Sequence, residues 1–208
     1  MRRTNSASRA STRSILWHTF RVRWLAVALA SALLLAASAS ARTTSQPTWK
    51  SLRRPLHLPR VASGGPCPIS PLRNARLKRG EVRPLLGAGP AYPILNGRYL
   101  DFFWPTLPSQ LDFAGTGWSG NKVMWVVAAG YRGRVLVRGR QLDGSHELRF
   151  DTPMTRERKL FGSTGADPVR RYPGYTRVQA PGCYAYQVDG AAFSRVIVFE
   201  ARIIPPPP

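Results

Sequence analysis

The chain has 208 residues, is 43% hydrophobic and carries a formal net charge of +21 at pH 7, from 31 Lys and Arg against 10 Asp and Glu. This length allows one domain with a substantial core plus an additional segment. Two cysteines without a Cys-x-x-Cys pair, few histidines, and the lack of a phosphate-binding loop or dinucleotide fingerprint argue against metal and nucleotide sites. We therefore expect no metal and no cofactor.

The first 41 residues have the three parts of a secretory signal peptide. Six arginines and no acids occupy the first 23 residues, an apolar run covers 24–35, and Ala-Ser-Ala follows at 39–41. This pattern predicts export and a mature N-terminus at Arg42, outside the cytoplasm. The alternative is an uncleaved membrane anchor, but a spanning helix needs about 20 apolar residues. Residues 24–41 offer at most 18 and include three serines.

The charge excess persists after the predicted cleavage. Residues 42–208 contain 25 basic and 10 acidic residues, a net charge of +15, and 27 of the 31 basic residues of the whole chain are arginines. Arginine suits phosphate, sulfate and carboxylate partners. The alternative is that arginine codons are frequent in a GC-rich genome, which the many Ala, Pro and Gly residues also fit. Both explanations remain open, because net charge indicates non-specific association rather than a site.

Residues 42–80 are rich in proline, arginine and lysine, and their hydrophobic residues follow no period. Such a segment cannot bury enough apolar surface to order itself, so we expect a disordered basic arm. Four residues could tether it to another part of the protein: Trp49, Leu56, Leu58 and Cys67.

From residue 81 the sequence pattern changes: short apolar runs alternate with Gly, Pro, Asp and Ser. This predicts an all-β sandwich over residues 81–204, followed by a polyproline tail at 205–208 that cannot join a sheet. The predicted strands lie at 98–104, 122–127, 134–140, 147–150, 159–161, 175–180, 182–188 and 195–203.

Alternation in the strand 182–188 predicts which side chains form the core. Tyr184, Tyr186 and Val188 share one face, which we expect to be buried, so Cys183 faces outward. An even number of cysteines in an exported chain favours a disulfide. A bond between Cys67 and Cys183 would staple the predicted arm across the outside of the sheet.

Two segments resemble known proteins. APGCYAYQVDGAAFSRVIVFEA, up to residue 201, resembles the last hairpin of an immunoglobulin-like sandwich, and residues 117–144 are similar to the middle strands of an uncharacterised family of exported bacterial proteins. The arm sequence RRPLHLPR…GGPCPISP is also similar to that family. The resemblance implies an immunoglobulin-like β-sandwich and no particular activity. Because Tyr184 directly follows Cys183, the inter-sheet disulfide of antibody domains is not expected.

The sequence offers two weak candidates for catalysis. Ser145, His146 and Glu147 form a tight polar group, but they follow Leu-Asp-Gly and fit a solvated hairpin turn. Asp101 and Asp112 could act as an acid and base pair, yet their spacing across a proline-containing loop has no signature. We therefore predict no catalytic residues and no enzyme.

Two features could bind a ligand. Arg132, Arg134, Arg138 and Arg140 have the same parity, so a regular strand would place them on one face, where they could bind a polyanion. The alternative is a solvated face or an edge guard against aggregation. Trp118 lies in a loop of small polar residues and could stack on a sugar ring, or fold back over the end of the sandwich.

These observations predict a non-enzymatic exported or cell-envelope module of unknown ligand, whose partners are anionic envelope polymers or another envelope protein. Nucleic acid is not favoured, because the arginine row has few interleaved aromatic residues. A membrane becomes a partner only if the signal segment is not cleaved. A purely structural or stress-related envelope protein is the alternative, and a secreted hydrolase is the third possibility.

Overall fold

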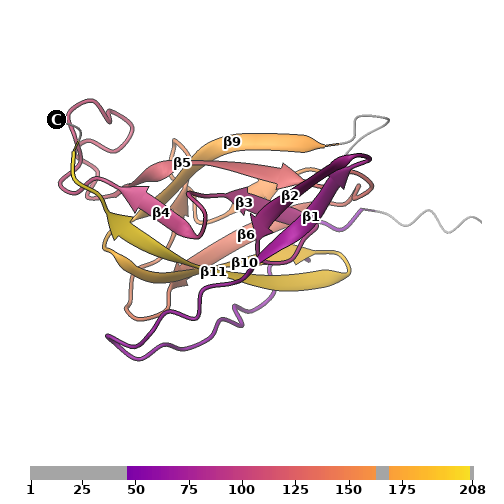
Figure 1. Cartoon of the computed structure of the whole chain (residues 1–208), viewed down its shortest axis with the longest axis horizontal. Coiled ribbons are helices and arrows are strands. Elements are labelled where there is room, and N and C mark those ends of the chain that lie inside the picture. Colours follow the sequence, from indigo (N-terminus) through magenta and orange to yellow (C-terminus); the bar gives the residue numbers. More distant parts are fainter. Residues whose placement is uncertain (1–45, 163–168, 207–208) are drawn as a thin grey trace, which may run out of the picture. The chain divides into compact units, whose positions relative to one another are not determined.

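The computed structural model describes residues 46–162 and 169–206, and within them the chain is all β with no helix (Figure 1). The predicted signal peptide, the cleavage site before Arg42 and the last two prolines lie outside the described residues. No helix in the described part has the length and hydropathy needed to cross a membrane.

The strands form two larger sheets and one hairpin. The five-stranded sheet has the order β4 (Tyr99–Phe102), β11 (Phe193–Ile203), β10 (Gly182–Gly190), β6 (Val135–Gln141) and β8 (Arg158–Leu160). The four-stranded sheet has the order β3 (Ala91–Ile94), β5 (Ser119–Val127), β9 (Arg170–Val178) and β7 (Arg149–Phe150). Neighbouring strands are antiparallel, except that β4 pairs with β11 in parallel.

The main core lies between these two sheets and contains buried side chains from both. Tyr184, Tyr186 and Val188 of β10 are fully buried in it, as their alternation predicts. Trp125 of β5 packs edge-on against Tyr186, with ring centroids 5.1 Å apart. Val137 of β6 also faces this core, and the predicted inward face of β10 is confirmed.

One buried hydrogen bond joins the two sheets inside the core. The Tyr186 hydroxyl donates to Oγ1 of Thr176 on β9 at 2.9 Å, and both residues are fully buried. Burial raises the pKa of Tyr186 far above its ordinary value, so the hydroxyl keeps its proton and remains a donor.

We expect Tyr186→Phe to lower the free energy of unfolding by about 1–2 kcal/mol, because the buried Thr176 hydroxyl loses its partner. Urea denaturation followed by tryptophan fluorescence measures this loss. Tyr99→Phe is the matched control, since the partly exposed Tyr99 makes ring contact with Arg202 and needs no hydroxyl for it. Equal stability of Tyr186→Phe and wild type would contradict the assigned bond.

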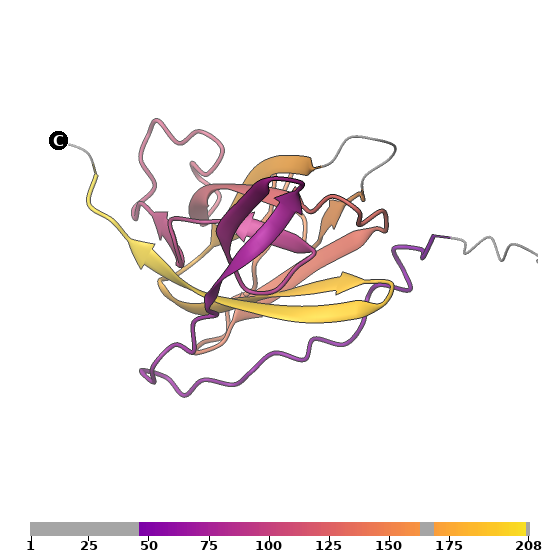
Figure 2. The same ribbon diagram turned by 45° about the vertical axis from the view of Figure 1, so that its right-hand side comes forward.

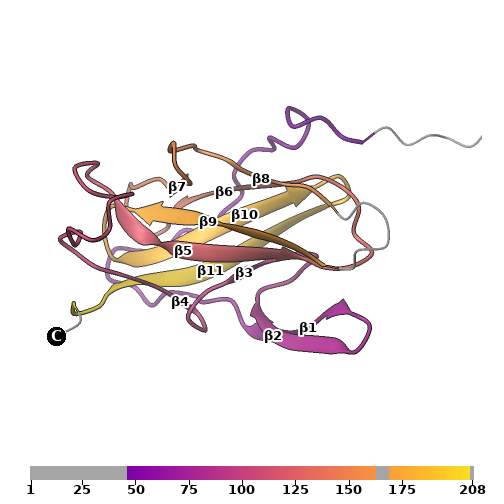
Figure 3. The ribbon, with the colours of Figure 1, turned by 90° about the horizontal axis from the view of Figure 1, so that it is seen from above.

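A third element covers part of the outer face of the four-stranded sheet. Strands β1 (Leu72–Lys78) and β2 (Glu81–Leu86) form an antiparallel hairpin, seen apart from the two sheets in Figure 3. Three of its buried side chains form a second core with Val126 of β5, Ala128 directly after β5 and Val169 directly before β9: Ala75, Leu77 and Leu85. The predicted arm boundary at residue 80 therefore falls inside the turn of a hairpin, and 72–80 belong to the folded part of the protein.

Residues 46–71, called the arm segment below, are ordered along the outer face of the five-stranded sheet, so the expected disorder is wrong for them. Figure 2 shows this segment running along the β10–β11 hairpin. Cys67 forms the predicted disulfide with Cys183, with Cα atoms 5.4 Å apart. Leu58 and Val61 pack beside this bond in an outer apolar cluster with residues of the sheet. The arm does not order itself; the sheet and the disulfide order it.

Candidate functional site

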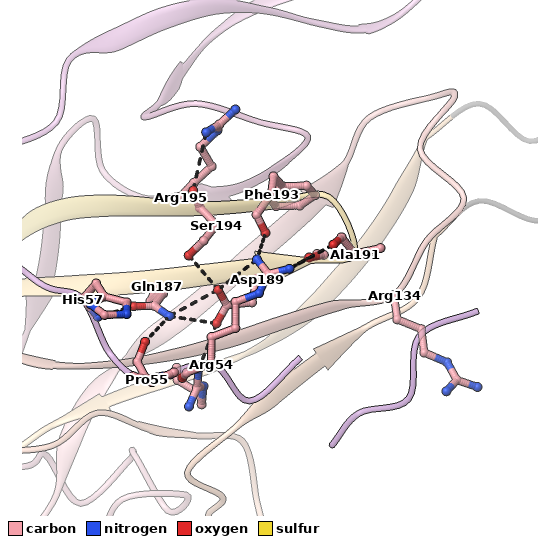
Figure 4. Close-up of polar contacts among 12 residues, drawn as sticks. Arg54, Pro55, His57, Arg134, Gln187, Asp189, Ala191, Phe193, Ser194 and Arg195 are labelled. Carbon is pink, nitrogen blue, oxygen red and sulfur yellow. Dashed lines mark hydrogen bonds and ion pairs between the residues drawn. The ribbon is translucent and has the colours of Figure 1, made fainter. Parts of the chain in front are cut away.

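The outward face of β10 carries a buried polar group that holds the arm segment, which we call the Asp189 cluster (Figure 4). The Asp189 side chain is fully buried and accepts hydrogen bonds from three others. Nη2 of Arg138 on β6 lies 2.9 Å from Oδ2, the Ser194 hydroxyl of β11 lies 2.7 Å from Oδ1, and Nε2 of Gln187 lies 3.0 Å from Oδ2. The carboxylate is thereby surrounded by donors, as a buried charge requires.

The cluster also contacts the backbone of the arm segment. The Gln187 amide accepts from the His57 N–H at 2.7 Å and donates to the Pro55 carbonyl at 3.0 Å. Arg138 donates to the Arg54 carbonyl. These bonds satisfy backbone groups of an extended, proline-containing stretch that has no strand partner there.

Arg54 closes the other side of the cluster. Its guanidinium donates to the carbonyls of Phe193, Gly190 and Ala191 at 2.6–2.9 Å, all at the β10–β11 turn. Nη1 also lies 3.9 Å from Oδ1 of Asp189. Arg54 of the arm segment therefore binds the backbone carbonyls at the β10–β11 turn. These contacts explain how a basic segment is held on a protein of the same charge.

The predicted arginine row is divided between internal and exposed side chains. Arg134 donates to the Pro47 carbonyl at 3.2 Å and its guanidinium lies 5.2 Å from the Trp49 ring. Arg138 belongs to the Asp189 cluster, whereas Arg132 and Arg140 are exposed. Arg138 and Arg140 lie on the outward face of β6, whereas Arg132 and Arg134 precede the strand, and the arm segment contacts the two middle members of the row.

A second basic group, which we call the Glu81 cluster, lies on the β1–β2 hairpin. The Glu81 carboxylate is within 4.0 Å of Lys78, Arg83 and Arg171. Three further exposed arginines lie on the same hairpin: Arg73, Arg76 and Arg79. A hollow of about 700 Å³ beside the hairpin turn is lined partly by Arg76, Lys78 and Arg79. This group was not predicted because 72–80 were expected to be part of a disordered arm. The alternation of Ala75 and Leu77, with Leu85 on the second strand, was the signal that could have revealed the hairpin.

Trp118 is half-buried directly before β5. The Arg149 guanidinium lies over its ring, 5.7 Å from the centroid, and Arg149 is paired with Glu147. The Arg149 guanidinium therefore covers part of the Trp118 ring. The Trp118 side chain is neither fully exposed to solvent nor fully buried.

The two aspartates that the sequence offered for catalysis have different partners in the structure. Asp101 is paired with Arg202 at 2.8 Å, while Asp112 accepts from the Tyr175 hydroxyl at 2.6 Å. Ser145 is exposed at a turn, where no contact joins its hydroxyl to His146 in the described structure. The residues described contain no group of three or more His, Cys, Asp or Glu side chains able to hold a metal ion.

Comparison with known protein families finds no matching family model, and comparisons with curated proteins and with solved structures find no similar protein.

Proposed function

We propose that this protein is an exported, non-enzymatic β-sandwich of the immunoglobulin-like kind that binds polyanions, such as acidic polymers of the cell envelope. The observation that carries the proposal is the Glu81 cluster, where six cations accompany a single carboxylate beside a hollow of about 700 Å³. Such a surface attracts phosphate, sulfate or carboxylate groups through long-range charge and arginine hydrogen bonds.

Most of the acids of the described chain are already neutralised. Of nine acidic residues in it, six form ion pairs within 4.0 Å: Glu81, Asp101, Glu147, Asp151, Glu157 and Asp189. The same residues include 24 Lys and Arg. The excess positive charge therefore faces solvent rather than internal acids, and the hairpin is where it is most concentrated.

Export is supported by the signal pattern of residues 1–41 and by the disulfide, since disulfides persist mainly in oxidising compartments. The immunoglobulin-like topology is supported by the resemblance of the last hairpin and by a core shared between two sheets. A purely structural envelope protein is the second candidate, favoured by the use of Arg54, Arg134 and Arg138 for internal contacts.

The test compares two variants of equal charge. We expect Arg73→Gln/Arg76→Gln/Arg79→Gln to elute from immobilised polyphosphate or heparin at lower salt than wild type. With duplex DNA as a calibrated polyanion, its log–log salt slope should fall by about 2–3 units, nearly one unit for each phosphate that the variant no longer binds. The matched control is Arg132→Gln/Arg140→Gln/Arg195→Gln, which removes three exposed arginines elsewhere.

Elution of the control near the wild-type position would support the hairpin. Equal losses in both variants would show that only net charge matters, and a greater loss in the control would favour the predicted row. Either result, or no retention of wild type at low salt, would overturn the proposal for the hairpin.

A further inference from the structure

Two adjoining hollows lie at the start of β5, away from the residues on which the β1–β2 hairpin packs. The larger, of about 360 Å³, is lined by residues 109–113 of the loop after β4 and by Asn121, Lys122 and Tyr175. The smaller, of about 220 Å³, lies between β3 and β4 and shares Asn121 and Lys122 with it. Lys122 and Tyr175 are direct cross-strand partners, so their side chains share the outer face of the sheet.

The wall of the larger hollow is ordered by its own contacts. The Tyr175 hydroxyl donates to Oδ2 of Asp112 at 2.6 Å, and the Phe113 ring meets Tyr175 edge-on at 5.3 Å. Beneath them the buried Arg177 donates to the Asp112 carbonyl at 2.6 Å and lies 4.6 Å from the Phe113 centroid. A preformed aromatic wall of this kind is typical of a small-ligand site.

Polar groups around this wall have no partner in the described structure. The Gln110 side-chain carbonyl oxygen is buried and accepts no hydrogen bond, although its backbone carbonyl accepts from Phe113 and Ala114. Lys122 is exposed and forms no ion pair with any described acid. The Lys122 ammonium can only donate hydrogen bonds. Oε1 of Gln110 can only accept them, and so can Oδ1 of Asp112 when that carboxylate is ionised.

A ligand that satisfies this set must offer donors and acceptors close together on a compact frame. Neighbouring hydroxyls of a sugar ring do so, because each both donates and accepts, while the ring carbons can lie against Tyr175 and Phe113. We propose that this hollow binds a sugar unit of a glycan, with Lys122 as a polar contact and with the Gln110 side chain turning to bring its buried Oε1 to the ligand. The site is distinct from the Glu81 cluster and from Trp118, which Arg149 covers in part.

The test titrates ¹⁵N-labelled protein with cellotriose, maltotriose, xylotriose and chitotriose. We expect at least one to give saturable shifts of the amides of 109–113 and 121–122 and of the Gln110 side-chain amide. Gln110→Leu should stay folded, because it replaces a buried unsatisfied amide with an apolar group of similar size, and should bind at least tenfold more weakly. Lys122→Met should also weaken binding.

Trp118→Phe is the control at the alternative aromatic residue and should leave the affinity within about twofold. Lack of saturable shifts with all four trisaccharides would overturn the proposal, as would equal affinity of folded Gln110→Leu and wild type. Polyanion retention should be the same in Gln110→Leu and wild type. The proposal of a sugar site and the proposal that the hairpin binds polyanions can therefore be rejected independently of each other.

Discussion

Asp189→Ala should lower the free energy of unfolding by about 3–5 kcal/mol, because it leaves the largely buried Arg138 without its carboxylate partner. Gln187 and Ser194 lose an acceptor in the same change. Urea denaturation measures the loss. Limited proteolysis should also cut within residues 52–60 sooner, since Arg138 and Gln187 hold that stretch of backbone.

Glu200→Ala is the matched control for this prediction. Glu200 lies on the neighbouring strand β11, is partly exposed and forms no ion pair among the described residues, so its removal should change stability by no more than about 0.5 kcal/mol. Asp189→Leu combined with Arg138→Met should recover part of the loss, because an apolar pair leaves no buried charge. A loss below about 1 kcal/mol in Asp189→Ala would contradict the role of the cluster.

Reduction of the Cys67–Cys183 bond should lower the free energy of unfolding by about 5 kcal/mol in the chain-entropy model, since the bond closes a loop with a sequence separation of 116. The whole stability of a domain is typically about 5–15 kcal/mol, so the effect should be large. Denaturation midpoints with and without dithiothreitol measure it.

Cys67→Ser/Cys183→Ser should unfold at the same denaturant concentration as the reduced wild type and should not respond to dithiothreitol. This control separates loss of the bond from other effects of the reductant. Identical midpoints for oxidised and reduced wild type would show that the other contacts of the arm segment suffice to hold it.

Sequence alone predicted most of the strands that form the main core. All eight predicted strands are present with shifted ends, because alternation of apolar residues directly reports which side chains face a core. The same parity placed Cys183 outside the core and so anticipated a staple by Cys67. β3 was not predicted, because it has only four residues and one of them is Pro93. β1 and β2 were not predicted, because the many arginines and prolines in and around them obscure the alternation of their apolar residues.

The positions of the candidate sites depend on which segments cover the outer faces of the two sheets. No local sequence pattern predicts that covering. Parity correctly put Arg138 on the outside of β6, but only the folded chain shows that the arm segment contacts both Arg138 and Arg134. The Gln110 hollow joins residues of β5, β9 and the loop after β4, which are far apart in sequence.

The sequence by itself determined the all-β class of fold, the core face of β10 and the disulfide partners, because these follow from composition, period, parity and the presence of only two cysteines. Only the tertiary structure decided that the arm segment is ordered, that 72–86 form a hairpin and that three exposed arginines, Arg73, Arg76 and Arg79, lie on it. The physical reason is that a polar, proline-rich segment gains order only from long-range partners. Asp189, Gln187 and Cys183 lie more than 100 residues further along the chain than the arm segment that they hold.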